Sequence, residues 1–271
     1  MAKTGPQRYP GSATGSSWYQ DTYGGDVMES NVVVWHTTEG TSLPTYGGGT
    51  SAPNFTAVPD FTAKVLRWHQ HFDFDVSSRA LVNKAGGVET NTLNAVQVEL
   101  VGTCDPTAHK RWGSRPHLYT PELPDWVIRD LAAFARWARD HHGVPLSSGQ
   151  TFVAYPASYG ATKTRMTNAE WLSFKGHCGH QHVPENDHGD PGRFPIDAIL
   201  AAADGGATPS EEDDMPTPLQ FWNYRNKNAK GKIPDAYGYL TGTAADVDAL
   251  RAEVAGLRKD MTTLINLVKK G

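Results

Sequence analysis

The sequence predicts a mixed α/β (α+β) domain, in which helices flank a central mixed β-sheet, followed by a linker and a C-terminal helical segment. Two short apolar runs, 32–35 and 95–101, are rich in β-branched residues and are typical of strands in one sheet. Downstream, the stretch that follows Thr120 has the periodicity of an amphipathic helix. Strands interspersed with helices indicate a layer of helices packed on a sheet.

The first strand is predicted over residues 32–35, VVVW, and His36 follows it directly. The second is predicted over residues 95–101, AVQVELV, which alternate in part between apolar and polar side chains before Gly102 ends the run. A histidine at the end of a rigid strand has a fixed position, which suits a metal ligand.

The main helix is predicted to begin near Thr120, because Pro121 suits a first helical position and Glu122 the first turn. Gly143 then ends a pattern with spacings of four, three and four, formed by Val127, Leu131, Phe134 and Ala138. Thr167 and Glu170 have capping-box spacing, which predicts a short helix that leads straight into a histidine-rich segment.

Composition divides the chain into three parts. We expect a catalytic domain over residues 1–203, an acidic Gly/Pro linker over 204–217 and a C-terminal region over 218–271. Apolar residues at alternating spacings of three and four predict a helix over 244–269. Two interpretations stay open: a short coiled coil that joins copies of the chain into a homo-oligomer, or one amphipathic helix that docks on the catalytic domain.

Charge and targeting patterns exclude several classes of protein. With 25 Lys+Arg against 29 Asp+Glu, the formal charge of -4 predicts neither a nucleic-acid surface nor an anionic-membrane surface. The first 16 residues have no apolar core, so we expect neither a signal peptide nor membrane insertion. Cys104 and Cys178 are expected to be reduced thiols of a cytoplasmic product, although a disulfide between them stays open.

Histidines cluster in one part of the chain. Four of the eleven lie within residues 176–192, GHCGHQHVPENDHGDPG, which we expect to form one loop. Zinc prefers neutral imidazole nitrogens with a carboxylate, and a catalytic zinc site keeps its fourth position open. One loop rarely supplies three corners of a tetrahedron, so we expect the third ligand from elsewhere, and His36 is the best donor. A turn-forming Asp190 and an adventitious His-rich face are the plainer alternatives.

In combination these motifs resemble the type 2 N-acetylmuramoyl-L-alanine amidases, which share a fold with the peptidoglycan recognition proteins. Residues 32–40, VVVWHTTEG, look like the first motif of the family, a strand that ends in a histidine. Residues 91–102, NTLNAVQVELVG, are similar to its middle motif, and residues 179–192 fit its last motif, in which Asp-Pro-Gly begins ten positions after Gly-His. The resemblance covers roughly residues 27–200 and is greatest to endolysins of phages of actinobacteria.

The resemblance implies roles for five residues and for a sixth as an alternate. His36, His180 and Asp190 would bind Zn²⁺, with His182 as the alternate ligand. Glu99 would take the proton of the attacking water or hydrogen-bond a ligand. His188 stands where many relatives have a Lys, and a protonated imidazole there would donate a hydrogen bond to the developing oxyanion. We therefore expect activity to fall more steeply on the alkaline side than in a Lys enzyme.

A further set of residues is expected to line the substrate groove, although large aromatic residues most often fill cores. The set is Trp35, Thr37, Tyr46, Asn54, Trp68 and Arg79.

The expected function is zinc-dependent hydrolysis of the amide bond between N-acetylmuramic acid and L-alanine in bacterial peptidoglycan. The expected setting is a phage endolysin that accumulates in the host cytoplasm and reaches the wall after a holin opens the membrane. The alternative is a non-catalytic peptidoglycan-binding module of the same fold. A purely structural zinc site would favour four protein ligands and would need Cys178.

Overall fold

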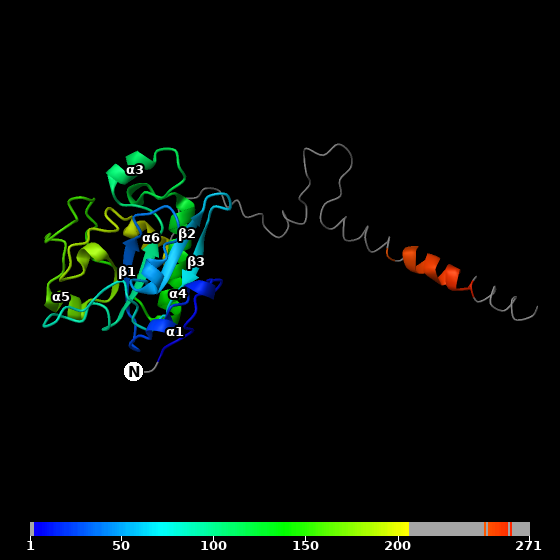
Figure 1. Cartoon of the computed structure of the whole chain (residues 1–271), viewed down its shortest axis with the longest axis horizontal. Coiled ribbons are helices and arrows are strands. Elements are labelled where there is room, and N and C mark those ends of the chain that lie inside the picture. The colour runs from blue at the N-terminus through cyan, green and yellow to red at the C-terminus, as the bar shows by residue number, and fades with distance from the viewer. Residues whose placement is uncertain (1–2, 206–246, 248, 260, 262–271) are drawn as a thin grey trace, which may run out of the picture. The chain divides into compact units, whose positions relative to one another are not determined.

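The structure is a computed structural model that describes residues 3–205, 247, 249–259 and 261 (Figure 1). Contacts divide the chain into two units, Met1–Ser210 and Glu211–Gly271, and each is described by itself. The predicted linker, 204–217, lies outside the described residues except for Asp204 and Gly205. Within the predicted helix over 244–269, the described residues are helical. No helix in these described parts is long and apolar enough to cross a membrane.

The first unit contains five strands, six α-helices and three short 3₁₀ helices among its described residues. The strands are β1 (Val32–Thr37), β2 (Phe55–Asp60), β3 (Val65–Gln70), β4 (Ala95–Leu100) and β5 (Gly176–Gly179). The α-helices are α1 (Gln20–Tyr23), α2 (Tyr46–Gly49), α3 (Pro106–Trp112), α4 (Asp125–His142), α5 (Asn168–Ser173) and α6 (Ile196–Ala203). The 3₁₀ helices are η1 (Gly15–Ser17), η2 (Thr120–Glu122) and η3 (His180–His182).

The sheet confirms the predicted fold class. Its strand order is β3-β2-β4-β1-β5, with β1, β2, β4 and β5 parallel and β3 antiparallel to β2. Helices α4 and α6 pack against each other and cover one face (Figure 1). Because parallel strands end at the same edge of a sheet, the residues at the carboxyl ends of β1 and β4 are neighbours.

Alternation along the strands separates an apolar face from a polar one. Val33 and Trp35 of β1 belong to the core beneath α4, together with Val96 and Val98 of β4. Successive side chains of a strand point to opposite faces, so His36 lies on the face away from α4. By the same alternation, Thr56, Gln97 and Glu99 share that second face. The apolar positions therefore fix which polar side chains meet.

The predicted strands are confirmed, and the predicted main helix is confirmed with a later start. Thr120 begins the separate turn η2, and α4 begins only at Asp125. The reason is Pro124, which keeps Leu123 extended and has no N–H to contribute to a helix. Gly143 ends α4 with a left-handed φ of 70°.

The capping box of α5 is confirmed, whereas the expected histidine loop is wrong. Thr167 accepts from the amide of Glu170 at 3.3 Å, and the Glu170 carboxylate accepts from the amide of Thr167 at 2.7 Å. Residues 176–179, however, form β5 along the edge of β1, and His177 stacks on Trp35 in the core. The four histidines thus do not share one loop, because pairing with β1 extends the first part of the segment.

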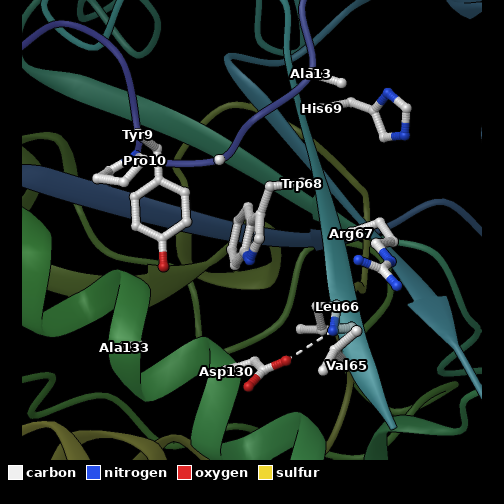
Figure 2. Close-up of a pocket in the computed structure, with 11 residues that line it drawn as sticks. Tyr9, Pro10, Ala13, Val65, Leu66, Arg67, Trp68, His69, Asp130 and Ala133 are labelled. Atoms are coloured by element: carbon white, nitrogen blue, oxygen red, sulfur yellow. Dashed lines mark hydrogen bonds between the residues drawn. The ribbon is translucent and has the colours of Figure 1, made fainter. Parts of the chain in front are cut away.

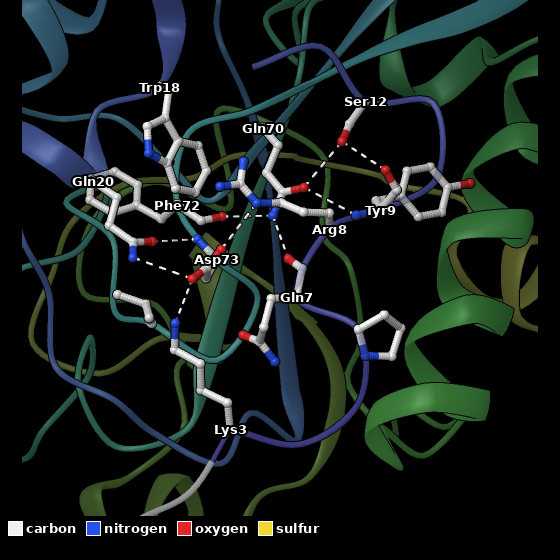
Figure 3. A network of polar contacts seen from close by, with 12 residues as sticks. Lys3, Gln7, Arg8, Tyr9, Ser12, Trp18, Gln20, Gln70, Phe72 and Asp73 are labelled. Atoms are coloured by element: carbon white, nitrogen blue, oxygen red, sulfur yellow. Dashed lines mark hydrogen bonds and ion pairs between the residues drawn. The ribbon is translucent and has the colours of Figure 1, made fainter. Parts of the chain in front are cut away.

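The N-terminal segment covers part of the edge of β3. Backbone hydrogen bonds join Ala13 to Trp68 and Gln70, both at 2.8 Å. Figure 3 shows the Asp73 carboxylate accepting hydrogen bonds from Lys3 at 2.5 Å and from Gln20 at 3.3 Å. These contacts hold the segment against the domain.

A hollow remains beside this segment, between β3 and α4. Figure 2 shows Tyr9 and Trp68 lining it, with the Asp130 carboxylate accepting from the amide of Leu66 at 2.7 Å. The Tyr9 ring also packs edge-on against Trp68 and Phe134. The carboxylate therefore satisfies a backbone donor of the edge strand next to the core.

Three buried histidines remain neutral when the protein is folded. Burial lowers the pKa of His177 to about 3 and the pKa values of His71 and His182 to about 4. The ordinary value in an unfolded chain is about 6.5, so between about pH 4 and 6.5 the unfolded chain binds more protons than the folded one. Stability is therefore present above about pH 6.5 and is lost as the pH falls through this window.

We expect each of these histidines to cost about 1.4 kcal/mol of unfolding free energy per pH unit within the window. Urea unfolding between pH 7.5 and 4.5, with chelator present throughout so that metal release does not contribute, measures the slope. The raised pKa values of Glu99 and His36 give an opposing slope, so His71→Gln, which keeps both groups, is the control and should show a smaller net slope than the native protein. Equal slopes in the two proteins would contradict the assignment.

Candidate metal centre

The candidate site lies where β1 and β4 end. His36 of β1 is in register with Glu99 of β4, which is in register with Thr56 of β2. The three residues therefore form a row across three adjacent strands, on the face away from α4. His180 and Asp190 reach the same place from η3 and from the turn that precedes α6.

Three buried side chains converge at the end of this row. The Nδ1 atoms of His36 and His180 are 3.1 Å apart. One oxygen of Asp190 lies 3.3 Å from His36 Nδ1, and the other lies 3.2 Å from His180 Nδ1. Among the described residues, this is the group of His, Cys, Asp and Glu with the geometry to hold a metal ion.

The protonation of these groups suits a cation. The Gln97 side-chain oxygen lies 2.8 Å from His36 Nε2 and accepts its proton, which leaves Nδ1 free to bind a cation. Burial lowers the pKa of His180 to about 4, so its imidazole is neutral near pH 7. Burial raises the pKa of Asp190, but the two histidines outweigh burial and hold the carboxyl ionised.

His36 responds to the same negative charge. Burial lowers its pKa, but the hydrogen bond to Asp190 and the charge of Glu99 outweigh burial and shift the pKa upward. The pocket therefore favours a positive charge between His36 and Asp190, whether a proton or a metal ion supplies it.

Backbone contacts fix the position of Asp190. Its carboxylate accepts from the amide of Thr37 at 3.3 Å, and its carbonyl accepts from the amide of Gln181 at 2.9 Å. The side chain of Gln181 donates to Gly192 at 2.7 Å. Asp190 is thus held by the residue next to His180, so the two candidate ligands are positioned together.

Gly179 leaves room for this turn. A Cβ added to it would lie 2.6 Å from Pro191 Cδ and 2.8 Å from the Phe152 ring. Both distances are shorter than real Cβ contacts, so Pro191, and Asp190 with it, would have to shift. This contact gives a physical reason for the glycine before His180.

We expect Gly179→Ala to weaken metal binding by about tenfold or more, because Asp190 moves away from the two imidazoles. Zinc titration against a competing chelator measures the change. Gly256→Ala is the matched control, since a Cβ there meets no atom within 4 Å. Equal affinity in the two variants would show that the Gly179 contact does not position Asp190.

Two further carboxylates lie beside the three ligands. Burial raises the pKa of Glu99 to about 7, opposed by His36 and supported by Asp190 and Glu39. One oxygen of Glu99 is buried and has no hydrogen-bond partner among the described residues. The Glu39 carboxylate, in contrast, accepts from the Thr37 hydroxyl at 2.6 Å and from the amide of Cys104 at 3.0 Å. Glu99 is therefore the carboxylate that is free to act on a ligand in the pocket.

A cleft of about 550 Å³ opens over these groups. His36, His180, Asp190 and Glu99 contribute to its lining, and so does His188. The side chain of His188 is 69% exposed, stacks on His180 and has its Nδ1 3.8 Å from Asp190. His188 is thus at the mouth of the cleft rather than in the buried group.

Only some of the other predicted site residues reach the cleft. Thr37 and Tyr46 line it. Trp35 and Trp68, expected in the groove, are fully or nearly buried in the core around Phe134, because alternation turns both toward α4. The groove prediction is wrong for these two tryptophans.

Asn54 and Arg79 serve the backbone instead of the cleft. The buried amide of Asn54 donates to the carbonyls of Asp73 and Val76. The guanidinium of Arg79 donates to Thr50 and lies over the Tyr23 ring. Neither residue lines the cleft.

His182 does not join the ligands. Its Nδ1 accepts from the amide of Gly179 at 2.8 Å, and its Nε2 donates to the carbonyl of Thr151 at 3.1 Å. Both ring nitrogens are therefore occupied by backbone groups. The alternate-ligand prediction is wrong, because these backbone contacts leave no ring nitrogen of His182 for a cation, and the candidate group is His36, His180 and Asp190.

Sequence reasoning missed Gln97 and Arg165. Gln97 stands two residues before Glu99, so period-two alternation already placed it on the same face. The Arg165 guanidinium donates to the carbonyls of Val183 at 3.2 Å and His188 at 2.8 Å. It thereby ties together the loop that carries His188, and no motif indicated this role.

Neither cysteine is in a disulfide. Cys104 and Cys178 are both buried free thiols, and burial raises the pKa of each. Cys178 lies on β5 in the core, away from the three ligands, so it is not a fourth ligand.

Comparisons with known proteins do not assign a family. No family model matches the chain, and no curated protein matches it in sequence. A solved structure of a PlyL mutant is similar at 9% identity and a TM-score of 0.33, over 50% of this chain and 77% of that chain. The amidase resemblance therefore rests on the motifs, and the site rests on its own geometry.

Proposed function

We propose that this protein is a zinc-dependent N-acetylmuramoyl-L-alanine amidase. The observation that carries the proposal is the trio of His36, His180 and Asp190 at the foot of a cleft that also contains Glu99. Ligands about 2.0–2.1 Å from zinc in a tetrahedron lie roughly 3.3 Å from one another. The two imidazole nitrogens, 3.1 Å apart, are close to such an edge, and one oxygen of Asp190 lies beside each of them, at 3.3 Å from His36 and 3.2 Å from His180. The three residues line an open cleft, which would leave a fourth position accessible.

The chemistry of the cleft suits hydrolysis of an amide. Zinc, when bound, polarises a carbonyl oxygen and acidifies water, which an unreactive amide needs. Glu99 accepts the proton of the attacking water and returns it to the leaving amine. Burial raises the pKa of Glu99, which makes this carboxylate a better proton acceptor than an exposed glutamate.

Peptidoglycan is the proposed substrate because the motifs resemble amidases of the bacterial wall. The proposed biological role is a phage endolysin that acts after a holin opens the host membrane. The bond cleaved is the amide between the lactyl group of N-acetylmuramic acid and the L-alanine of the stem peptide.

Digestion of purified peptidoglycan tests the proposed reaction. We expect new L-alanine amino termini and no new reducing sugar ends. Reducing ends without free alanine would identify a glycosidase and overturn the proposal. Binding to peptidoglycan without release of either end would support the non-catalytic module instead.

His188 is proposed to donate a hydrogen bond to the oxygen that gains charge during attack. Its position at the mouth of the cleft, stacked on His180, leaves it within reach of a substrate. A protonated imidazole is needed for this role, so we expect His188→Lys to keep activity at higher pH than the native protein. Rates from pH 6 to 9.5 measure this difference. If the rates of the two proteins fall identically with rising pH, His188 does not donate this hydrogen bond.

A further inference from the structure

A chain of hydrogen bonds leads from the cleft into the interior. The Tyr46 hydroxyl, which lines the cleft, lies 2.7 Å from the hydroxyl of Thr56. That hydroxyl lies 2.8 Å from His71 Nε2, and His71 Nδ1 lies 2.6 Å from the carbonyl of Ser17. Thr56 and His71 are fully buried. Thr56 is also in register with Glu99, so this hydrogen-bond chain passes beside the proposed base.

The direction of each hydrogen bond follows from the carbonyl at its inner end. A carbonyl can only accept, so His71 Nδ1 must carry a proton. Burial lowers the pKa of His71 to about 4, which leaves a single proton on the ring near pH 7. Nε2 is therefore bare and accepts the hydroxyl proton of Thr56. The oxygen of Thr56, having donated its proton, accepts the proton of Tyr46.

Tyr46 stays a neutral phenol in this arrangement. Burial raises the pKa of its hydroxyl, and the charge of Glu99 raises it further. A phenol has one O–H, and here that O–H points inward to Thr56. Only lone pairs of the Tyr46 oxygen are left to face the cleft.

We propose that His71 and Thr56 are positioning residues that turn the Tyr46 hydroxyl inward, so that Tyr46 accepts a hydrogen bond from a substrate N–H. The substrate class follows from the proposed function, since the stem peptide supplies amide N–H groups next to the bond to be cleaved. Glu99 and Asp190 accept protons or cations on the same side, which makes the cleft rich in acceptors.

The tautomer of His71 tests the hydrogen-bond chain without an enzyme assay. Nitrogen NMR of the full-length protein, with His71→Gln to assign the signal, distinguishes a protonated ring nitrogen from a bare one. We expect protonated Nδ1 and bare Nε2 from pH 6 to 8. A proton on Nε2, or a cationic ring, would reverse the bond to Thr56 and overturn the proposal.

Substitutions at Thr56 test the consequence for substrate. Thr56→Val keeps the shape but removes the hydroxyl, so the Tyr46 O–H is free to turn toward the cleft. The loss of one hydrogen bond is expected to raise KM about tenfold with little change in kcat. Thr56→Ser restores the hydroxyl and is expected to restore KM.

A variant with both Thr56→Val and Tyr46→Phe distinguishes an effect on the Tyr46 hydroxyl from a general loss of stability. Tyr46→Phe removes the acceptor, so adding Thr56→Val to it is expected to cause no further loss. An equal loss from Thr56→Val in both backgrounds would show that Thr56 acts structurally, and would overturn the proposal. If the native protein releases no L-alanine termini, the proposed function fails, whereas the NMR result still decides the hydrogen-bond chain.

A separate observation in the second unit supports an interaction surface. Val247, Leu250, Val254, Leu257 and Met261 are between 41% and 63% exposed on one helix. Their spacings alternate between three and four, which gives heptad a positions at 247, 254 and 261 and d positions at 250 and 257. Leu264 and Val268 continue the pattern in sequence and lie outside the described residues.

The residue types favour one occupant for this surface. Val247 and Val254 at a, with Leu250 and Leu257 at d, favour two strands in a parallel coiled coil, and Met261 is the third a residue. Glu253 then falls at g and Arg258 at the following e, which face each other between parallel helices and have opposite charges. We infer that this face binds the same face of a second copy of the chain in a parallel dimer.

Light scattering of the full-length protein is expected to give the mass of two chains. Leu257→Asp is expected to give the mass of one, while Ala252→Asp, on the opposite side at f, stays dimeric. Val254→Cys is expected to cross-link under mild oxidation, since a positions meet only in the parallel arrangement. A native monomer, which would fit docking on the catalytic unit or on wall polymer, would overturn the inference, as would a dimer that does not cross-link.

Discussion

Asp190→Asn is expected to abolish metal binding and, with it, the release of L-alanine from peptidoglycan. Each carboxylate oxygen of Asp190 faces the Nδ1 atom of one histidine, at 3.3 Å and 3.2 Å. An asparagine has one acceptor oxygen, no charge, and an NH₂ group that would point at the cation or at an imidazole. We expect affinity for zinc to fall by more than about 100-fold, beyond the range seen when a supporting partner is lost.

Asp187→Asn is the matched control for this prediction. Asp187 is an exposed aspartate on the same loop, and it lies outside the group of three ligands. Zinc content of the purified proteins and the rate of alanine release should both stay at the native level in this control. An Asp190→Asn protein that keeps one zinc and full activity would show that the cation is held elsewhere.

Glu99→Gln is expected to leave zinc bound and to lower kcat by roughly 10²- to 10⁴-fold, the usual contribution of a positioned general base. Glu99 is not one of the three ligands, and its buried, unpartnered oxygen has no structural hydrogen bond to lose. The amide of glutamine is similar in shape but takes no proton. The variant should therefore bind zinc but hydrolyse the amide bond far more slowly.

Two measurements on the same protein check this separation. Zinc content should equal that of the native protein, and the rate of alanine release should collapse. Glu29→Gln, at an exposed position, controls for loss of one surface charge. If Glu99→Gln retains its rate, the base is another group, and if it loses zinc, Glu99 supports the ligands instead.

Local sequence signals predicted the elements that carry the candidate metal ligands. The apolar run before His36 has the β-branched residues that favour a strand, and burial on both faces explains why it reads as continuous rather than alternating. The spacing between His180 and Asp190 was visible in the sequence because only ten positions separate them. A short separation in sequence leaves little freedom for where two side chains can meet.

The unpredicted parts depend on contacts between distant segments. Strands β2 and β3 escaped prediction because Pro59 and Arg67 interrupt their apolar patterns. Arg67 is exposed on the edge strand β3, and Pro59 lies in the part of β2 that pairs with β3 but not with β4. The row of Thr56, Glu99 and His36 depends on the register between three strands, and one residue of slip would turn every side chain to the other face. No motif carries that information.

The two histidines on η3 also show that the sequence alone does not reveal which side chains meet. His180 and His182 are similar in the sequence, and both are close enough to Asp190 to be ligands. The backbone amide of Gly179 and the carbonyl of Thr151 occupy the ring of His182, which only the folded turn reveals. Backbone hydrogen bonds, rather than residue type, therefore determine which of the two histidines is available to a cation.

We propose that His36, His180 and Asp190 together hold one catalytic zinc ion. Titration of Zn²⁺ into chelator-treated protein, while the release of L-alanine amino termini from peptidoglycan is followed, tests it most directly. We expect no release without metal and a rise to a plateau at one equivalent per chain. Full release from the metal-free protein, or a rate indifferent to added zinc, would contradict it.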